Sequence, residues 1–165
     1  MPRNDDIPLI KAVKASTPKP TLRITWDDGQ VDRIDMTGPI ARLTALAPLE
    51  DKAAFLQVSV DASAMGVEWP CGADFSGTGL RDLADAQKPM TPTDFIAWQD
   101  RNRLSNKDAA GVIGITTRRV QDYRNGAATI PVSVQTTCKA IDDNPVIALA
   151  RIGPESSRGR PRKTA

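Results

Sequence analysis

Residues 104–126 read LSNKDAAGVIGITTRRVQDYRNG, and this stretch predicts two short helices joined by a tight turn. Ser105 and Asp108 have the spacing of a capping box, in which the two residues satisfy free N–H groups at a helix start. Gly114 is expected to end that helix, because glycine readily adopts the left-handed geometry found after helix ends. A second helix is expected over residues 117–124, before an Asn-Gly pair that closes it.

The second helix is expected to pack along one side only. Ala110 is small enough to let the two helices cross closely, and Ile115 and Val120 bury against it and its neighbours. The opposite side of the second helix then stays exposed. Its residues are Thr117, Arg118, Gln121 and Asp122, with Arg119 and Arg124 at the flanks.

This pattern resembles the helix-turn-helix of the lambda-repressor and Cro family (XRE-type), over roughly residues 93–150. In that family the second helix of the motif lies in the DNA major groove. The resemblance implies that base edges are contacted by Thr117, Arg118 and Gln121, with Arg118 suited to guanine and Gln121 to adenine. It places phosphate contacts at Asn106, Arg119 and Asn125, with Lys107 as a basic candidate nearby.

The chain departs from the family at several positions. Gln99 stands where the family often has Arg, and Arg124 stands where it has a Glu partner, so that internal ion pair is expected to be absent. Ala109 replaces a frequent Leu, and Asp122 puts a negative charge near the expected groove. The structural alternative is a small helical bundle whose arginines are merely solvated.

Further helices are expected around this pair. Thr91 and Asp94 form another capping box, with Pro92 at the first helical position. Two more helices should follow Pro131 and Pro145. Residues 91–152 are therefore predicted to form an all-α, five-helix domain of the lambda-repressor type.

A short basic tail, residues 153–165, is expected to be disordered. Its Arg158, Gly159, Arg160 and Pro161 resemble the core of an AT-hook, in which an extended Arg-Gly-Arg segment lies along the minor groove. The alternative is an arm that contacts phosphates without specificity.

Residues 1–90 predict a small α+β domain with an antiparallel sheet and one or two helices. Strands are expected at 11–15, 21–26, 31–36, 55–60 and 67–69, with helices starting at Pro39 and over 77–86. Gly29 supplies the tight turn between the second and third strands.

Residues 8–90 resemble a small bacterial domain of unknown function, through Asp28-Gly29, Val31-Asp32, Asp35, Phe55, Val58, Val60, Glu68-Trp69-Pro70, Asp74 and Leu80. That family occurs alone or fused to a helix-turn-helix, and some members are encoded beside another small uncharacterised protein, in a suspected toxin-antitoxin pair.

Charge is divided unevenly along the chain. Residues 1–91 carry 10 Lys and Arg against 13 Asp and Glu, residues 92–151 carry 8 against 6, and residues 152–165 carry 4 against 1. An acidic first part and a basic end are expected when one end contacts a polyanion.

Composition argues against catalysis. Histidine is absent, and the two cysteines, Cys71 and Cys138, lie far apart without a CxxC partner. Cys71 is the only conceivable nucleophile, and it lacks the usual activating base. Trp26 and Trp69 are expected in the core. No cofactor and no metal are expected, because Asp27, Asp28, Asp32 and Asp35 lack the spacing of a cation cage and are predicted to be turn and solvent-facing residues.

The sequence therefore predicts a cytoplasmic protein that binds double-stranded DNA, a transcriptional regulator rather than an enzyme. A homodimer on two half-sites and a small protein partner of residues 1–90 are further expectations, and no membrane segment is expected. One rival is an antitoxin-like interaction module that binds DNA only for autoregulation. The other rival is an enzyme that uses Cys71.

Overall fold

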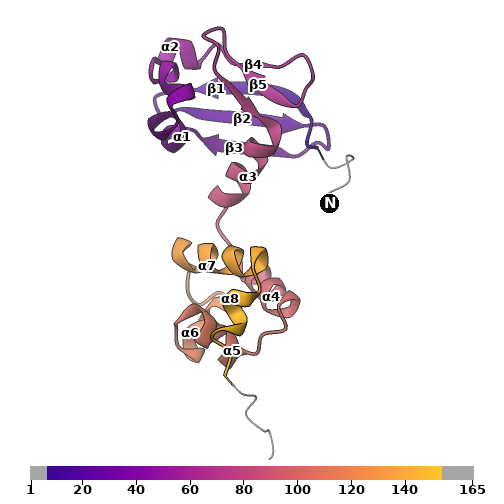
Figure 1. The fold of residues 1–165 in the computed structure, drawn as a ribbon, viewed down its shortest axis with the longest axis vertical. Helices are drawn as coiled ribbons and strands as arrows, with labels where there is room; N and C mark the ends of the chain where they lie inside the picture. The colour runs from indigo at the N-terminus through magenta and orange to yellow at the C-terminus, as the bar shows by residue number, and fades with distance from the viewer. Residues whose placement is uncertain (1–6, 154–165) are drawn as a thin grey trace, which may run out of the picture. The chain divides into compact units, whose positions relative to one another are not determined.

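A computed structural model describes residues 7–153, and its class is α+β, as predicted. The chain divides into two units, Met1–Lys88 and Pro89–Ala165. Figure 1 shows strands and short helices in the first unit and helices alone in the second. None of the helices in residues 7–153 is both long and apolar enough to cross a membrane.

Three antiparallel strands begin the first unit, in the order β1 (Ile10–Ser16), β2 (Thr21–Trp26) and β3 (Val31–Asp35). Gly29 has a φ of +84°, the left-handed geometry that the β2–β3 turn requires. On β2, Leu22, Ile24 and Trp26 are fully buried, while Arg23 between them is exposed. This alternation gives the sheet one core face and one solvent face, and it confirms the three predicted strands.

Short elements complete the first unit. They are α1 (Thr37–Arg42), the 3-10 helix η2 (Thr44–Glu50), α2 (Lys52–Phe55), β4 (Ser59–Val60), β5 (Gly66–Glu68), β6 (Asp74–Ser76) and α3 (Gly77–Gln87). Strands β4, β5 and β6 pair antiparallel in a second sheet. The core includes Phe55, Leu80 and both tryptophans, Trp26 and Trp69.

Three predictions for this unit are wrong, two of secondary structure and one of solvent exposure. Residues 55–60 do not form one strand, because the Asp51 carboxylate accepts a hydrogen bond from the Ala53 N–H (3.0 Å) and so caps α2. Phe55 therefore ends a helix, and only Ser59–Val60 is extended. The helix predicted to start at Pro39 begins earlier, at Thr37, and ends at Arg42, after which Leu43 has an extended backbone.

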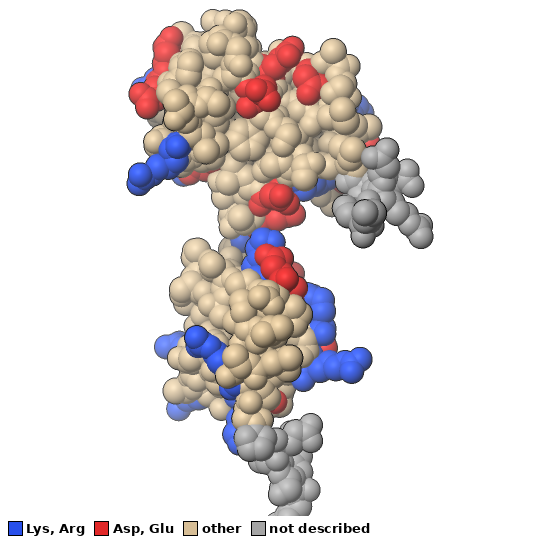
Figure 2. Space-filling view, in the orientation of Figure 1, with Lys and Arg blue, Asp and Glu red and all other residues tan. Residues whose placement is uncertain are grey.

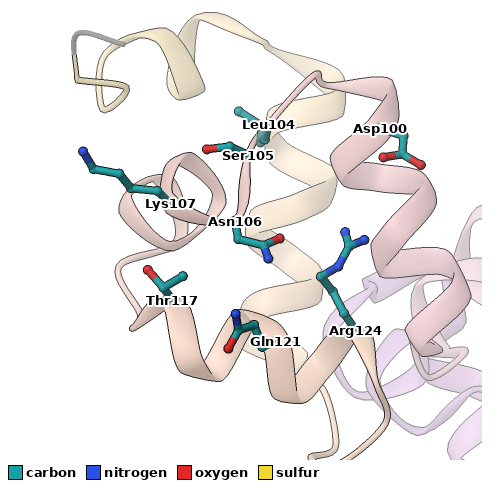
Figure 3. Close-up of a pocket in the computed structure, with 8 residues that line it drawn as sticks. All are labelled: Asp100, Leu104, Ser105, Asn106, Lys107, Thr117, Gln121 and Arg124. Carbon is teal, nitrogen blue, oxygen red and sulfur yellow. The ribbon is translucent and has the colours of Figure 1, made fainter. Parts of the chain in front are cut away.

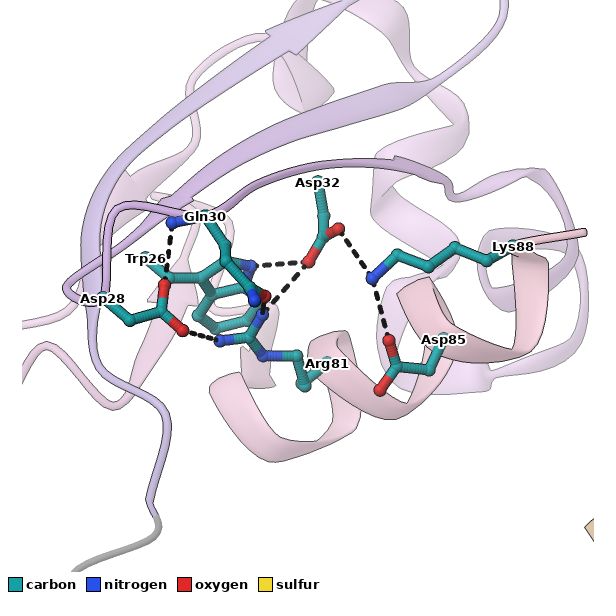
Figure 4. Close-up of polar contacts among 7 residues, drawn as sticks. All are labelled: Trp26, Asp28, Gln30, Asp32, Arg81, Asp85 and Lys88. Carbon is teal, nitrogen blue, oxygen red and sulfur yellow. Dashed lines mark hydrogen bonds and ion pairs between the residues drawn. The ribbon is translucent and has the colours of Figure 1, made fainter. Parts of the chain in front are cut away.

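Asp32 is also not solvent-facing, since it is only 6% exposed. Its Oδ2 accepts a hydrogen bond from Trp26 Nε1 (2.7 Å), and its Oδ1 lies 3.0 Å from Lys88 Nζ (Figure 4). Arg81 of α3 stacks 4.2 Å above the Trp26 ring and pairs with Asp28 at 2.9 Å. Burial raises the pKa of Asp32, but hydrogen bonds from Lys88 and Trp26 outweigh it and hold that pKa below its usual value. The cluster ties α3 to the β2–β3 hairpin.

Five helices form the described part of the second unit, as predicted. They are α4 (Pro92–Arg101), α5 (Asn106–Ile113), α6 (Thr117–Arg124), α7 (Val132–Asp143) and α8 (Val146–Leu149). Phe95 lies in the core of this unit. Its ring centroid is 5.4 Å from that of Trp98 and 5.7 Å from that of Tyr123. Both predicted capping boxes, at Thr91 with Asp94 and Ser105 with Asp108, are formed.

Candidate nucleic-acid interface

The turn between α5 and α6 has the geometry expected from its residues. Gly114 has a φ of +82°, and its N–H and that of Ile115 both donate to the Ala110 carbonyl at 2.9 Å. Thr116 Oγ1 then accepts a hydrogen bond from the Arg119 N–H (3.2 Å), which caps the start of α6. The two helices are therefore joined by a short turn that is hydrogen-bonded at the end of α5 and capped at the start of α6.

Helix α6 has two distinct faces. Val120 is fully buried and Tyr123 nearly so, and they hold the helix against the core. The other face is exposed, and it carries Thr117, Arg118, Arg119 and Gln121. Asp122, which was expected on this face, is half-buried. The buried face thus fixes the helix in place, and the exposed face presents polar and basic side chains to solvent.

An open groove of about 490 Å³ lies between the start of α5 and the exposed face of α6 (Figure 3). Its lining residues are Asp100, Leu104, Ser105, Asn106, Lys107, Thr117, Gln121 and Arg124. The fold therefore brings two predicted base-contacting residues beside two predicted phosphate-contacting residues. Arg118 and Arg119 lie outside this lining, and Asn125 is occupied as a turn residue, because its Oδ1 accepts from the Ala127 N–H (3.0 Å).

A chain of polar side chains joins α4, α5 and α6, and two of its members, Asn106 and Arg124, line the groove. Arg124 Nη1 donates to Gln99 Oε1 at 2.7 Å, and Gln99 Nε2 donates to Asn106 Oδ1 at 3.2 Å. Gln99 is only 1% exposed, so both of its amide atoms need partners inside the protein. Sequence reasoning treated these two positions as a lost ion pair and missed the hydrogen bond that replaces it. The available signal was that Gln99 and Arg124, at the two positions where the family has an ion pair, can still form a hydrogen bond.

Among the described residues of this unit, Arg101 and Lys139 have acidic partners, whereas the cations of the interface, like Arg103 and Arg151, have none. Asp142 pairs with Arg101 at 2.7 Å, and Asp143 pairs with Lys139 at 3.6 Å. Within residues 7–153, Lys107, Arg118 and Arg119 form no ion pair. On the faces that Figure 2 shows, basic side chains prevail on the second unit, and several acidic clusters lie on the first.

The candidate metal ligands and the two cysteines lie apart from one another in the described residues. Between residues 7 and 153, no three His, Cys, Asp or Glu side chains gather in a way that could hold a metal ion. Cys71 is exposed and Cys138 is buried, and burial raises the pKa of the Cys138 thiol to about 12. The AT-hook-like residues Arg158, Gly159, Arg160 and Pro161 lie outside the described residues.

Comparisons with known proteins found few matches. No curated protein matches this chain. Among solved structures, the chain is similar to a crystal structure described as a "Putative DNA Binding Protein" from Nitrosomonas europaea ATCC 19718. The two are 28% identical, 96% of each chain is covered, and the TM-score is 0.46. Residues 10–86, the span from β1 to α3, match the family described as "Protein of unknown function (DUF2442)".

Proposed function

We propose that this chain is a sequence-specific DNA-binding protein that acts as a transcriptional regulator, with α6 reading the major groove. The observation that carries the proposal is the division of α6 into two faces. Val120 and Tyr123 anchor one face in the core, while Thr117, Arg118 and Gln121 stand exposed on the rest of the helix. A helix about 10–12 Å wide with its side chains fits a major groove about 12 Å wide.

The exposed residue types suit base edges. The Arg118 guanidinium can donate two hydrogen bonds to the O6 and N7 atoms of guanine, and the Gln121 amide can both donate to and accept from adenine. Thr117, at the first position of α6, can offer a methyl group to thymine or a hydroxyl to a phosphate. These contacts specify sequence only if α6 is held in one orientation, which the Arg124–Gln99 hydrogen bond supports.

Phosphate contacts fall on the residues around α6. Asn106 and Lys107 are the first two residues of α5, where backbone N–H groups without partners in the helix attract anions. Arg119 adds an exposed cation on α6. These contacts fix the position of the helix on the duplex without reading sequence.

The test begins with selection of bound sequences from random duplex DNA by the whole chain. Two half-sites about one helical turn apart would be selected by a homodimer, and a single half-site by a monomer. Anisotropy titrations with the selected and a scrambled duplex then compare variants. Arg118→Ala and Gln121→Ala should each weaken binding to the selected duplex by about 1–3 kcal/mol, with little effect on the scrambled one. Arg119→Ala should weaken both duplexes alike.

Lys139→Ala is the matched control, because Lys139 lies on α7 and lines no part of the groove. It removes one cation, as Arg118→Ala does, and should bind the selected duplex nearly as the wild type does. Equal binding of the selected duplex by wild type, Arg118→Ala, Gln121→Ala and Arg119→Ala would overturn the assignment of α6.

A further inference from the structure

Three cations form a row across the solvent face of the first sheet. The strand register places Lys14 of β1 directly opposite Arg23 of β2, and Arg23 directly opposite Arg33 of β3. Residues directly opposite each other on antiparallel strands project to the same face. All three are exposed, and β1, β2 and β3 lie side by side in Figure 1. We call these three residues the basic row.

The basic row has no acidic partner among residues 7–153. This contrasts with Arg81 and Lys88, whose charges are neutralised by Asp28, Asp32 and Asp85 (Figure 4). The register places one acidic residue, Asp35, on the face of the basic row, and Lys19 pairs with it at 2.7 Å. Like charges directly opposite each other destabilise a sheet, so the row has an electrostatic cost that an external anion would relieve.

We propose that the basic row binds the phosphate backbone of duplex DNA. Strands lie about 4.8 Å apart, so the row extends over about 10 Å. One strand of B-DNA presents a phosphate about every 3.4 Å along the helix axis, so three long side chains spread over about 10 Å are within reach of about three phosphates. The guanidinium groups of Arg23 and Arg33 can each bind a phosphate through two parallel hydrogen bonds.

Duplex DNA fits this face better than an acidic protein segment does. The row is a regular line of charges on a strand surface, and it suits a regular line of anions. Only residues 88–91 separate α3 from α4, so the row is tethered to the proposed recognition helix. Once α6 is bound, a phosphate contact by the basic row is intramolecular and needs no second association. The inference therefore rests on the proposed function and adds a second DNA contact to it.

The test uses the whole chain, the selected duplex and a titration of salt. Arg23→Gln with Arg33→Gln removes two charges of the basic row. Arg42→Gln with Lys52→Gln is the matched control, because these exposed cations of the same unit lie on α1 and α2. The first pair should make the slope of log affinity against log salt shallower by up to about 1.8. If affinities converge at 1 M salt, affinity at 0.1 M then falls by up to about 60-fold. The control pair should change neither quantity.

Each outcome separates this inference from the function of α6. If the two double variants bind the selected duplex with the same affinity and salt slope, while Arg118→Ala weakens binding to it, the basic row makes no contact and the α6 proposal stands. If only Arg23→Gln with Arg33→Gln weakens binding, and Arg118→Ala does not, the basic row is supported and the role of α6 fails. If wild type binds no duplex, both fail. Equal competition by a polyglutamate peptide of matched charge would overturn the assignment to DNA and indicate an acidic protein partner. Melting temperatures of both double variants that equal or exceed that of the wild type exclude loss of fold.

Discussion

Arg124 and Gln99, which lie 25 residues apart, are joined by a hydrogen bond of 2.7 Å from Arg124 Nη1 to Gln99 Oε1. This contact links α6 to α4, and the Gln99 amide continues it to Asn106 of α5. Since Gln99 is almost completely buried, the bond satisfies an acceptor that water cannot reach. The buried Gln99 amide thus adds to the core contacts of Val120 and Tyr123 that hold the proposed recognition helix.

Arg124→Ala should destabilise the second unit by about 1–3 kcal/mol, because it leaves the Gln99 carbonyl buried without its partner. Replacing both residues, with Gln99→Leu and Arg124→Ala together, should cost less than the two single changes added. Urea unfolding followed by far-ultraviolet circular dichroism measures both. Arg151→Ala is the control, since Arg151 is an exposed arginine of the same unit. If Arg124→Ala lowers the free energy of unfolding no more than Arg151→Ala does, the Arg124–Gln99 hydrogen bond does not stabilise the second unit.

Two glycines of the same motif should respond to alanine with opposite signs. Gly114→Ala should destabilise the second unit by about 1–2 kcal/mol, because its φ of +82° is unfavourable for a side chain. Gly111→Ala should stabilise it by about 0.4–1 kcal/mol, since Gly111 lies inside α5 and a Cβ there meets only an ordinary contact at 3.7 Å. Thermal unfolding compares the two variants, and a shift in the same direction for both would contradict the assigned turn.

Acid should destabilise the first unit partly through Asp35. Burial raises the pKa of Asp35, but hydrogen bonds from Lys19 and Thr37 outweigh it and lower the pKa to about 2. The unfolded chain then binds more protons than the folded one, so the free energy of unfolding falls as the pH decreases from about 5 to 2. Asp35→Asn keeps the acceptor for Thr37 but removes the charge, and should make this fall shallower.

Urea unfolding at several pH values between about 3 and 6 measures the dependence on Asp35. Asp82→Asn serves as the control, because Asp82 is an exposed residue of α3 that pairs with no cation in the described residues. The same acid dependence in Asp35→Asn and the wild type would show that Lys19 and Thr37 do not hold its carboxylate.

The two cysteines should differ in reactivity. Cys138 is fully buried with a pKa of about 12, whereas Cys71 is exposed, so a disulfide reagent at neutral pH should modify only Cys71 in the folded protein. In the Cys71→Ser variant, labelling of Cys138 should then require opening of the second unit. The rate of labelling should therefore increase steeply with urea concentration. Rapid modification of Cys138 without urea would contradict its burial beside Trp98, whose indole N–H donates to the Cys138 carbonyl at 3.1 Å.

Local signals in the sequence determined much of this protein. The capping boxes at Ser105 and Thr91, the turn at Gly114 and the hairpin at Gly29 were all predictable. Each depends on residues within about four positions of one another, so its free energy hardly depends on the rest of the fold. Because the signals at both ends of α6 are also local, the sequence alone predicted its bounds, residues 117–124.

Tertiary structure alone decided the features that join distant segments. Asp32, which was predicted to face solvent, became a buried partner of Lys88. The Arg124–Gln99 bond and the basic row of Lys14, Arg23 and Arg33 depend on how helices cross and on which residues strands align. Helix crossing and strand register minimise the free energy of the whole core, so no window of neighbouring residues contains enough information to predict them.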